Sequence, residues 1–188
     1  MTLPTGKTVN VEALARLAVG GGDDAVDAWF RADHPTVWKL AFGFLGHAAE
    51  ADDLAQEAMV KLLDHLKEWD MRRSYRAWRS TVVANLCRDR LRRLETRSRA
   101  EARRAPRSAA LPGPEAALDQ GEIRDLLAQA LDILSPRERQ VFVLRDLEDH
   151  SHAEIAEVLE ISESSVRSQL TVARQRLRDH LSRRICGA

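Results

Sequence analysis

The residues best suited to contact nucleic acid lie near the C-terminus, where hydroxyl side chains and arginines share one face of an expected helix. Val166 and Leu170 mark its apolar stripe, so the polar residues between them should face outward. Arginine can form two hydrogen bonds with a guanine edge, and serine or threonine can reach phosphates or base edges. The outward residues are Ser164, Ser165, Arg167, Ser168, Thr171 and Arg174. This pattern favours a helix that enters the major groove of DNA.

The elements that must position this face are a short helix, a tight turn and a long helix between residues 151 and 184. Ser151 and Glu154 form a capping box at the start of the short helix, and Ile161-Ser162 makes the turn. This order is that of a helix-turn-helix. Glu160 stands where a left-handed residue, usually glycine, is expected, so the turn should be strained or of another geometry.

The alternative to DNA binding for this segment is an ordinary helical hairpin with a charged face. Residues 164–184 contain 6 Arg and 1 Asp. Such a bias toward arginine suits phosphate contact better than simple solvation. The composition therefore favours DNA binding.

The remaining apolar residues recur with the helical period, and no strand-type alternation of any length is present. We therefore expect an all-α fold. Trp29 and Phe30 should point inward, and Pro35 fits the first position of a new helix. The expected helices are a short one within 1–20, then 23–33, 35–45, 49–68, 74–95, 115–133, one from Pro136, and the helix-turn-helix pair.

Two small helical domains joined by a linker account for this order of elements. Pro106, Pro112 and Pro114 forbid a continuous helix between them, so the stretch that contains them is expected to be a linker. The expected segments are an N-terminal tail over 1–22, a four-helix module over 23–96, a linker over 97–114 and a helix-turn-helix module over 115–186.

Charge is unevenly spread, although the chain is formally neutral. Residues 1–70 hold 6 Lys/Arg and 12 Asp/Glu, a net charge of −6, whereas residues 71–107 hold 13 Arg and 3 Asp/Glu, a net charge of +10. Residues 108–188 carry the balancing −4. An acidic block beside a basic block predicts one surface for a basic partner and another for a polyanion.

Other classes of protein fit the sequence less well. Cys87 and Cys186 form no CxxC pair, which argues against a disulfide framework or a zinc knuckle. The sequence has neither a signal peptide pattern nor an apolar run long enough to span a bilayer, so we expect a cytoplasmic protein with no membrane insertion.

An enzymatic alternative is a metal-dependent hydrolase. Its best ligands would be Asp149, His150, His152 and Glu154. Glu154 already has a role in the capping box, and no glycine-rich phosphate loop accompanies these residues. We therefore expect no catalytic residue, no metal site and no cofactor.

Four stretches of the chain resemble the sigma-70 family in its small extracytoplasmic-function (ECF) branch. They are His34-Pro35 through Leu45-Gly46; Ala51-Asp52-Asp53-Leu54-Ala55-Gln56-Glu57; Tyr75-Arg76-Ala77-Trp78 with Asn85-Leu86 and Asp89-Arg90-Leu91-Arg92-Arg93; and Leu134-Ser135-Pro136-Arg137-Glu138-Arg139-Gln140-Val141-Phe142 with Ala153-Glu154-Ile155-Ala156, Ile161-Ser162, Val166 and Ala173-Arg174. The resemblance implies a sigma factor that binds core RNA polymerase and promoter DNA. It makes the two modules sigma regions 2 and 4.

The resemblance also implies roles for particular residues. The acidic segment would dock on a basic coiled coil of the polymerase beta-prime subunit through Asp52, Asp53, Gln56 and Glu57. The loop at 69–75 and the following helix would recognise the minus-ten element through Arg72, Arg73, Tyr75, Arg76, Arg79, Asn85, Arg88 and Arg92. Trp78 is assigned to the core, and Ala84 replaces the arginine of the family's Arg-Asn pair, which leaves one contact in doubt.

In the second module, the outward Ser/Thr/Arg face would read the minus-thirty-five element as duplex DNA. That module would also contact the polymerase beta flap, and the linker would run through polymerase channels. Family members are often held inactive by an anti-sigma factor, which adds a possible partner. The nearest alternative is a stand-alone helix-turn-helix regulator, which needs neither the acidic segment nor the arginine-rich helix.

Overall fold

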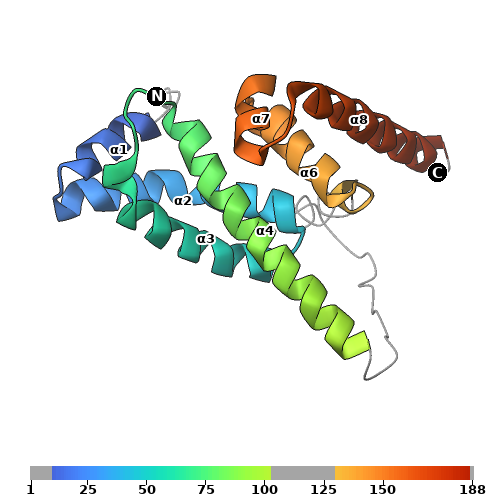
Figure 1. The fold of residues 1–188 in the computed structure, drawn as a ribbon, viewed down its shortest axis with the longest axis horizontal. Helices are drawn as coiled ribbons and strands as arrows, with labels where there is room; N and C mark the ends of the chain where they lie inside the picture. The colour runs from blue at the N-terminus through green and yellow to red at the C-terminus, as the bar shows by residue number, and fades with distance from the viewer. Residues whose placement is uncertain (1–9, 103–129, 187–188) are drawn as a thin grey trace, which may run out of the picture.

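A computed structural model of the chain describes residues 10–102 and 130–186, and its regular structure in these ranges is entirely helical (Figure 1). The expected all-α class is therefore confirmed. The elements are α1 (Val11–Val19), α2 (Asp23–Leu45), α3 (Ala48–Asp64), the 3-10 turn η1 (Leu66–Glu68), α4 (Tyr75–Ala102), α6 (Pro136–Phe142), the π-turn η2 (Val143–Leu147), α7 (His152–Leu159) and α8 (Glu163–Cys186). Among the described helices, none is long and apolar enough to cross a membrane.

The first four helices form one module around α2, which contacts α1, α3 and α4 (Figure 1). Trp29, Leu40, Leu54 and Met59 are fully buried in its core. Burying one such side chain stabilises the fold by about 1.5–3 kcal/mol. The short helix expected within residues 1–20 is confirmed: Asn10 caps α1, and the helix ends at Gly20.

The expected break between two helices at Pro35 is wrong, because α2 runs without interruption from Asp23 to Leu45. An internal proline removes one backbone hydrogen bond and costs about 3 kcal/mol. Trp29, Asp33 and Val37 nevertheless lie one turn apart on the buried face. Their packing against the rest of the module offsets the local cost. Phe30 falls off this face and is 37% exposed, contrary to expectation.

The second module begins, within the described residues, near Leu131. Both expected capping boxes are confirmed: Ser135 with Glu138 starts α6, and Ser151 with Glu154 starts α7. Each pair satisfies two backbone donors at the start of its helix. Val166 and Leu170 are buried in the core that holds α7 and α8 together.

The boundary between modules differs in detail from the expected one. Helix α4 continues to Ala102, so the first six residues of the expected linker are helical. Residues 103–129, with the rest of the expected linker and most of the helix expected at 115–133, lie outside the described residues.

The two modules are packed against each other, through contacts of α4 with α7 and of α2 with α6 and η2 (Figure 1). Gly43 allows the close approach, because a Cβ at this position would lie 2.9 Å from the methyl groups of Val143. Gly46 ends α2 with φ 73°, a left-handed conformation that glycine adopts without strain. The sequence left open whether the modules touch; in this structure they do.

Glu160 generates a prediction about stability, because it occupies the left-handed region with φ 54° and ψ 48°. The left-handed conformation costs an L-residue about 1–2 kcal/mol. Glycine avoids this cost, but its greater conformational entropy in the unfolded state offsets part of the gain. We expect Glu160→Gly to raise the free energy of unfolding by about 0.5–1 kcal/mol. Urea unfolding would measure it. Glu163→Gly, inside the first turn of α8, should instead lower stability, and a loss at both positions would contradict the strain at Glu160.

Candidate nucleic-acid and partner-binding surfaces

The outward face of α8 is positioned by the turn between α7 and α8. Ser162 caps the helix by accepting a hydrogen bond from the backbone N–H of Ser165 (3.1 Å). Behind the face, Ile155, Leu159 and Val166 are buried. All six residues of the expected DNA-reading face are exposed: Ser164, Ser165, Arg167, Ser168, Thr171 and Arg174.

Two arginines on this face are held by carboxylates. Arg174 donates to both oxygens of Asp146, at 2.6 and 3.2 Å, and this hydrogen bonding raises the pKa of its guanidinium. Arg167 pairs with Glu163 one turn earlier, at 2.9 Å. The guanidinium groups are thus oriented before any ligand arrives. A phosphate or base edge would compete with these exposed pairs, which contribute little to stability.

The acidic segment lies on the outer face of α3, with Asp52, Asp53, Gln56 and Glu57 all exposed. Leu54, Ala55 and Ala58 between them are buried, because the helical period sorts the two sets onto opposite sides. Asp52 accepts a hydrogen bond from the indole N–H of Trp38. The structure therefore brings the four predicted docking residues onto one surface.

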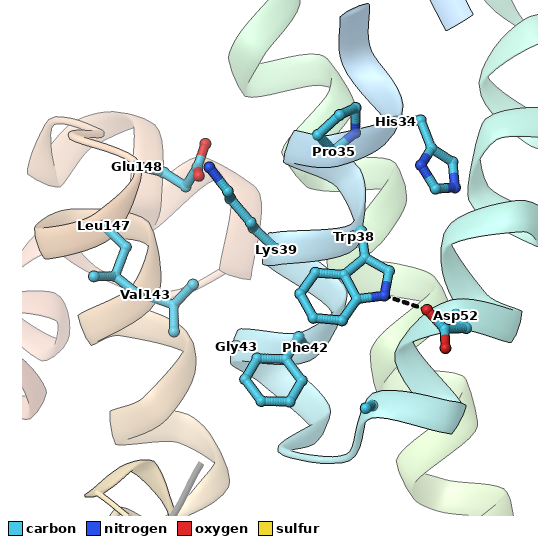
Figure 2. Close-up of a pocket in the computed structure, with 11 residues that line it drawn as sticks. His34, Pro35, Trp38, Lys39, Phe42, Gly43, Asp52, Val143, Leu147 and Glu148 are labelled. Atoms are coloured by element: carbon cyan, nitrogen blue, oxygen red, sulfur yellow. Dashed lines mark hydrogen bonds between the residues drawn. The ribbon is translucent and has the colours of Figure 1, made fainter. Parts of the chain in front are cut away.

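A groove of about 680 Å³ adjoins this surface, between α2, α3 and η2. Figure 2 shows Trp38 and Phe42 of α2 on one side and Val143 and Leu147 of η2 on the other. The two rings of α2 stack at 5.1 Å. Asp52, at the rim, joins the groove to the acidic face of α3. The sequence reasoning did not anticipate this apolar hollow, since it exists only where the modules meet.

The residues expected to recognise the minus-ten element are less uniformly placed. Arg72, Arg73 and Arg92 are exposed, and Asn85 and Arg88 are half-buried. Tyr75 and Arg79, expected on the DNA surface, are instead 1% and 5% exposed. The reason is a polar network inside the first module that the linear sequence does not reveal.

Asp33 is the centre of that network and is completely buried. Its carboxylate accepts hydrogen bonds from the hydroxyl of Tyr75 (2.6 Å) and from Nη1 of Arg79 (2.7 Å). The Tyr75 hydroxyl in turn accepts from the indole of Trp29 at 2.7 Å. Burial, followed by the nearby carboxylate of Asp33, raises the pKa of Tyr75 well above its usual value. Asp33 was not singled out from the sequence, although a charged residue in the apolar stripe Trp29–Val37 was a usable signal.

The network crosses into the second module at Arg79, whose Nη2 lies 3.3 Å from the carboxylate of Glu148. Arg76 reaches the backbone carbonyl of Glu148 (3.2 Å) and the carboxylate of Glu154 (3.3 Å). Arg73 pairs with Glu157. Arg73 in the loop before α4, and Arg76 and Arg79 on α4, thus meet carboxylates of α7 and of the turn before it.

His150 is fully buried at the same contact, and its Nε2 lies 3.0 Å from the hydroxyl of Ser80 on α4. Burial, with the nearby charge of Arg76, lowers the pKa of His150 to about 4. Glu154 and Asp149 oppose this shift. His150 is therefore neutral at pH 7. In the described part of the chain no group of three or more His, Cys, Asp or Glu side chains is placed to hold a metal ion.

Comparison with protein families matches both modules. Residues 29–97 match the model described as Sigma-70 region 2, and residues 124–177 match Sigma-70, region 4. The two matches together cover more than half of the chain. They do not support the alternative of a stand-alone regulator.

Individual relatives extend the match over nearly the whole chain. The ECF RNA polymerase sigma factor SigE of Mycolicibacterium smegmatis is 31% identical over 185 residues, which are 96% of this chain and 69% of that protein. SigL of Mycobacterium tuberculosis, also an ECF RNA polymerase sigma factor, is 33% identical over 168 residues, covering 85% of this chain and 93% of the relative.

Solved structures share the fold at lower identity. The sigma factor RpoE of Bartonella quintana, crystallised with the anti-sigma factor NepR, has a TM-score of 0.67 at 20% identity over 83% of this chain and 96% of that one. CnrH in complex with the cytosolic domain of CnrY has a TM-score of 0.64 at 24% identity, covering 91% and 96%. The chain belongs to the ECF group of the sigma-70 family, as a sigma factor that binds core RNA polymerase and directs transcription initiation from specific promoters.

Proposed function

We propose that this sigma factor divides its work among three surfaces. The outer face of α3 docks on core polymerase, α4 and the loop before it recognise the minus-ten element, and the start of α8 reads the minus-thirty-five element. The observation that supports this division best is a difference in exposure. The outer face of α3 and the start of α8 are exposed, whereas arginines of α4 and of the loop before it are paired with carboxylates of the second module. The domain assignment follows it: region 2 over 23–96, with α1 packed against it, and region 4 over 115–186.

The docking surface on α3 suits a basic partner. Asp53, Gln56 and Glu57 project from a single exposed face, and the surrounding residues 1–70 carry a net charge of −6. Complementary charge accelerates association and fixes orientation more than it adds affinity. The partner assigned to this face is the coiled coil of the beta-prime subunit, and the beta flap is assigned to the second module.

The minus-ten surface is divided between exposed and structural residues. Arg72 and Arg92 can meet phosphates or unstacked bases as they stand, and Arg73, Arg76, Asn85 and Arg88 complete the surface. We assign Tyr75 and Arg79 to holding the module together, because both are engaged with buried Asp33.

In the packed arrangement, carboxylates of the second module pair with arginines of α4 and of the loop before it. Glu157 and Glu154 stand where DNA phosphates would otherwise pair with Arg73 and Arg76. Minus-ten recognition therefore requires the modules to separate, whereas the faces of α3 and α8 are available beforehand. Contacts of this polar kind are typical of domain interfaces that open.

The cellular setting follows from the function. We infer that the protein acts in the cytoplasm with RNA polymerase and has no catalytic activity of its own, in keeping with a family whose members are not enzymes in general. The complex of the relative RpoE with the anti-sigma factor NepR supports an anti-sigma partner for this chain too.

The docking assignment predicts that Asp53→Arg combined with Gln56→Ala reduces association with core polymerase by at least about tenfold, because a repulsive charge replaces an attractive one. Co-purification with core polymerase measures this. Both side chains are exposed, so the unfolding temperature should not change. Asp179→Asn, on exposed α8, is the control that should associate normally. Normal association of the double variant would remove α3 from the interface.

The reading of the minus-thirty-five element predicts that Arg174→Ala, or Arg167→Ala, weakens initiation at promoters with a strong element. Loss of one base contact costs about 1–3 kcal/mol, or roughly tenfold in occupancy. Run-off transcription with core polymerase, with and without the minus-thirty-five element, separates this effect from general weakening. Equal transcription by variant and wild type on both templates would contradict the placement of α8.

Burial of His150 predicts that acid opens the modules. Its pKa is depressed in the packed form, so the open form binds a proton more readily between pH 6.5 and about 4, and the packed form loses stability as pH falls through this range. Lowering the pH from 7.5 to 5.5 should shift the equilibrium toward open by about tenfold. Burial raises the pKa of Glu148 in the packed form. Protonation of Glu148 therefore favours the packed form, but only at the lower pH values where carboxylates titrate.

Small-angle scattering at the two pH values would measure this opening as an increase in radius of gyration. His150→Gln keeps a hydrogen-bonding group for Ser80 without a titratable one, so its dimensions should not change over the same range. A wild-type radius that is constant from pH 7.5 to 5.5 would refute the role of His150.

A further inference from the structure

Helix α1 had no role in the sequence reasoning, but its position gives it one. Ala15 and Ala18 are buried on its inner face, and the helix contacts α2, η1 and α4. Asn10 caps its start, so the helix has a defined beginning. It therefore stands as a fixed element beside the loop that separates η1 from α4.

Arg16 extends from α1 to that loop and contacts it in two ways. Its Nη2 donates a hydrogen bond to the backbone carbonyl of Met71 at 2.7 Å. Its guanidinium carbon lies 5.1 Å from the ring centroid of Trp69, within cation–π range. Glu12, one turn earlier, accepts from the same nitrogen at 2.8 Å and so orients the guanidinium. The contact with Met71 joins residues 55 positions apart.

The loop at residues 70–74 is exposed, yet its backbone is held on several sides. The Asp70 carboxylate accepts from the N–H of Arg72 at 3.0 Å, and the Asp70 carbonyl from the N–H of Arg73 at 2.8 Å. From the core side, buried Trp69 donates its indole N–H to the carbonyl of Arg73 at 3.1 Å. Arg16 adds a restraint from outside, at the Met71 carbonyl between these bonds.

A loop with these properties is suited to receive an unstacked base. Capture of a base that has left the helix requires donors and apolar surface at set positions, since the energy of unstacking must be recovered from the pocket. Sites held to within about 0.5 Å by supporting contacts discriminate better than loose ones. The Arg16 restraint would preserve the loop's shape while Arg72, Arg73 and the half-exposed Met71 face the DNA.

We propose that Arg16, oriented by Glu12, is a positioning residue for minus-ten recognition, holding the loop at 70–74 in the shape that selects one base. This rests on the proposed function of that loop. It makes α1 part of the DNA-recognition apparatus, although Arg16 itself need not touch DNA. Selectivity at one base position, rather than overall activity, is then the property that depends on it.

The test uses run-off transcription by core polymerase with the full-length protein, on a promoter recovered from a library and on single-base variants of its minus-ten element. The proteins compared are wild type, Arg16→Ala, Arg16→Lys and Arg31→Ala. Arg31 is a matched control, because it forms an exposed pair with Asp27 one turn earlier but lies on α2 away from any such contact with the loop. Unfolding temperatures are measured in parallel.

We expect Arg16→Ala to lose roughly tenfold in discrimination at one minus-ten position, the size of one well-placed base contact, with an unchanged unfolding temperature. Arg16→Lys should restore part of it, since an ammonium can still donate to the Met71 carbonyl but lacks the planar group that lies over Trp69. Arg31→Ala should match wild type. Dependence on the minus-thirty-five element should be the same in all four proteins.

Two results would overturn the proposal: a wild-type selectivity profile in Arg16→Ala, or an equal loss on every template with a lower unfolding temperature. The second would make α1 a structural support only. The variants Arg72→Ala and Arg73→Ala test separately whether the loop at 70–74 recognises bases of the minus-ten element. If neither alters selectivity at any minus-ten position, the loop does not read bases, and the role of Arg16 falls with it.

Discussion

The buried ion pair between Asp33 and Arg79 is the interaction on which the arrangement of this protein depends. It joins α2 to α4 inside the first module, and Tyr75 supplies a further hydrogen bond to the Asp33 carboxylate. Removing one partner of such a pair leaves an uncompensated buried charge, which costs about 3–5 kcal/mol. The same guanidinium extends to Glu148, so the core of one module ends at the surface of the other. Arg79 therefore contributes both to the core of the first module and to the contact between the modules.

The three proposed surfaces therefore differ in how accessible they are in the packed structure. The faces of α3 and α8 are exposed, whereas Arg76 and Arg79 of α4 pair with carboxylates of α7 and of the turn before it. The cover is made of carboxylates and a neutral histidine, not of a large apolar surface. The more exposed pairs, those of Arg73 and Arg76, can be exchanged for phosphates at little net cost, because one anion replaces another. Such a cover favours a protein that is closed when free and open on its promoter.

Sequence patterns that act over a few residues predicted correctly those features that depend on neighbouring residues. The capping boxes at Ser135 and Ser151 start their helices, and Glu160 adopts the left-handed conformation despite lacking glycine's freedom. Pro35 shows the limit of such rules. Its local signal favours a helix start, but tertiary packing on both sides of it keeps α2 continuous, because several buried side chains contribute more than one lost hydrogen bond. The expected residues of the polymerase and minus-thirty-five surfaces lie together for a similar local reason, since each set belongs to one helix.

The sequence by itself determined the all-helical class, two modules, the helix-turn-helix and membership of the sigma-70 family. These depend on periodicity, caps and motifs, which act over a few residues. Only the tertiary structure decided that Tyr75 and Arg79 are internal, that His150 is buried against Ser80, and that Arg16 reaches Met71. These contacts join residues 42 to 70 positions apart in sequence. No local pattern records which distant groups will meet, because their pairing is selected by the packing of whole helices.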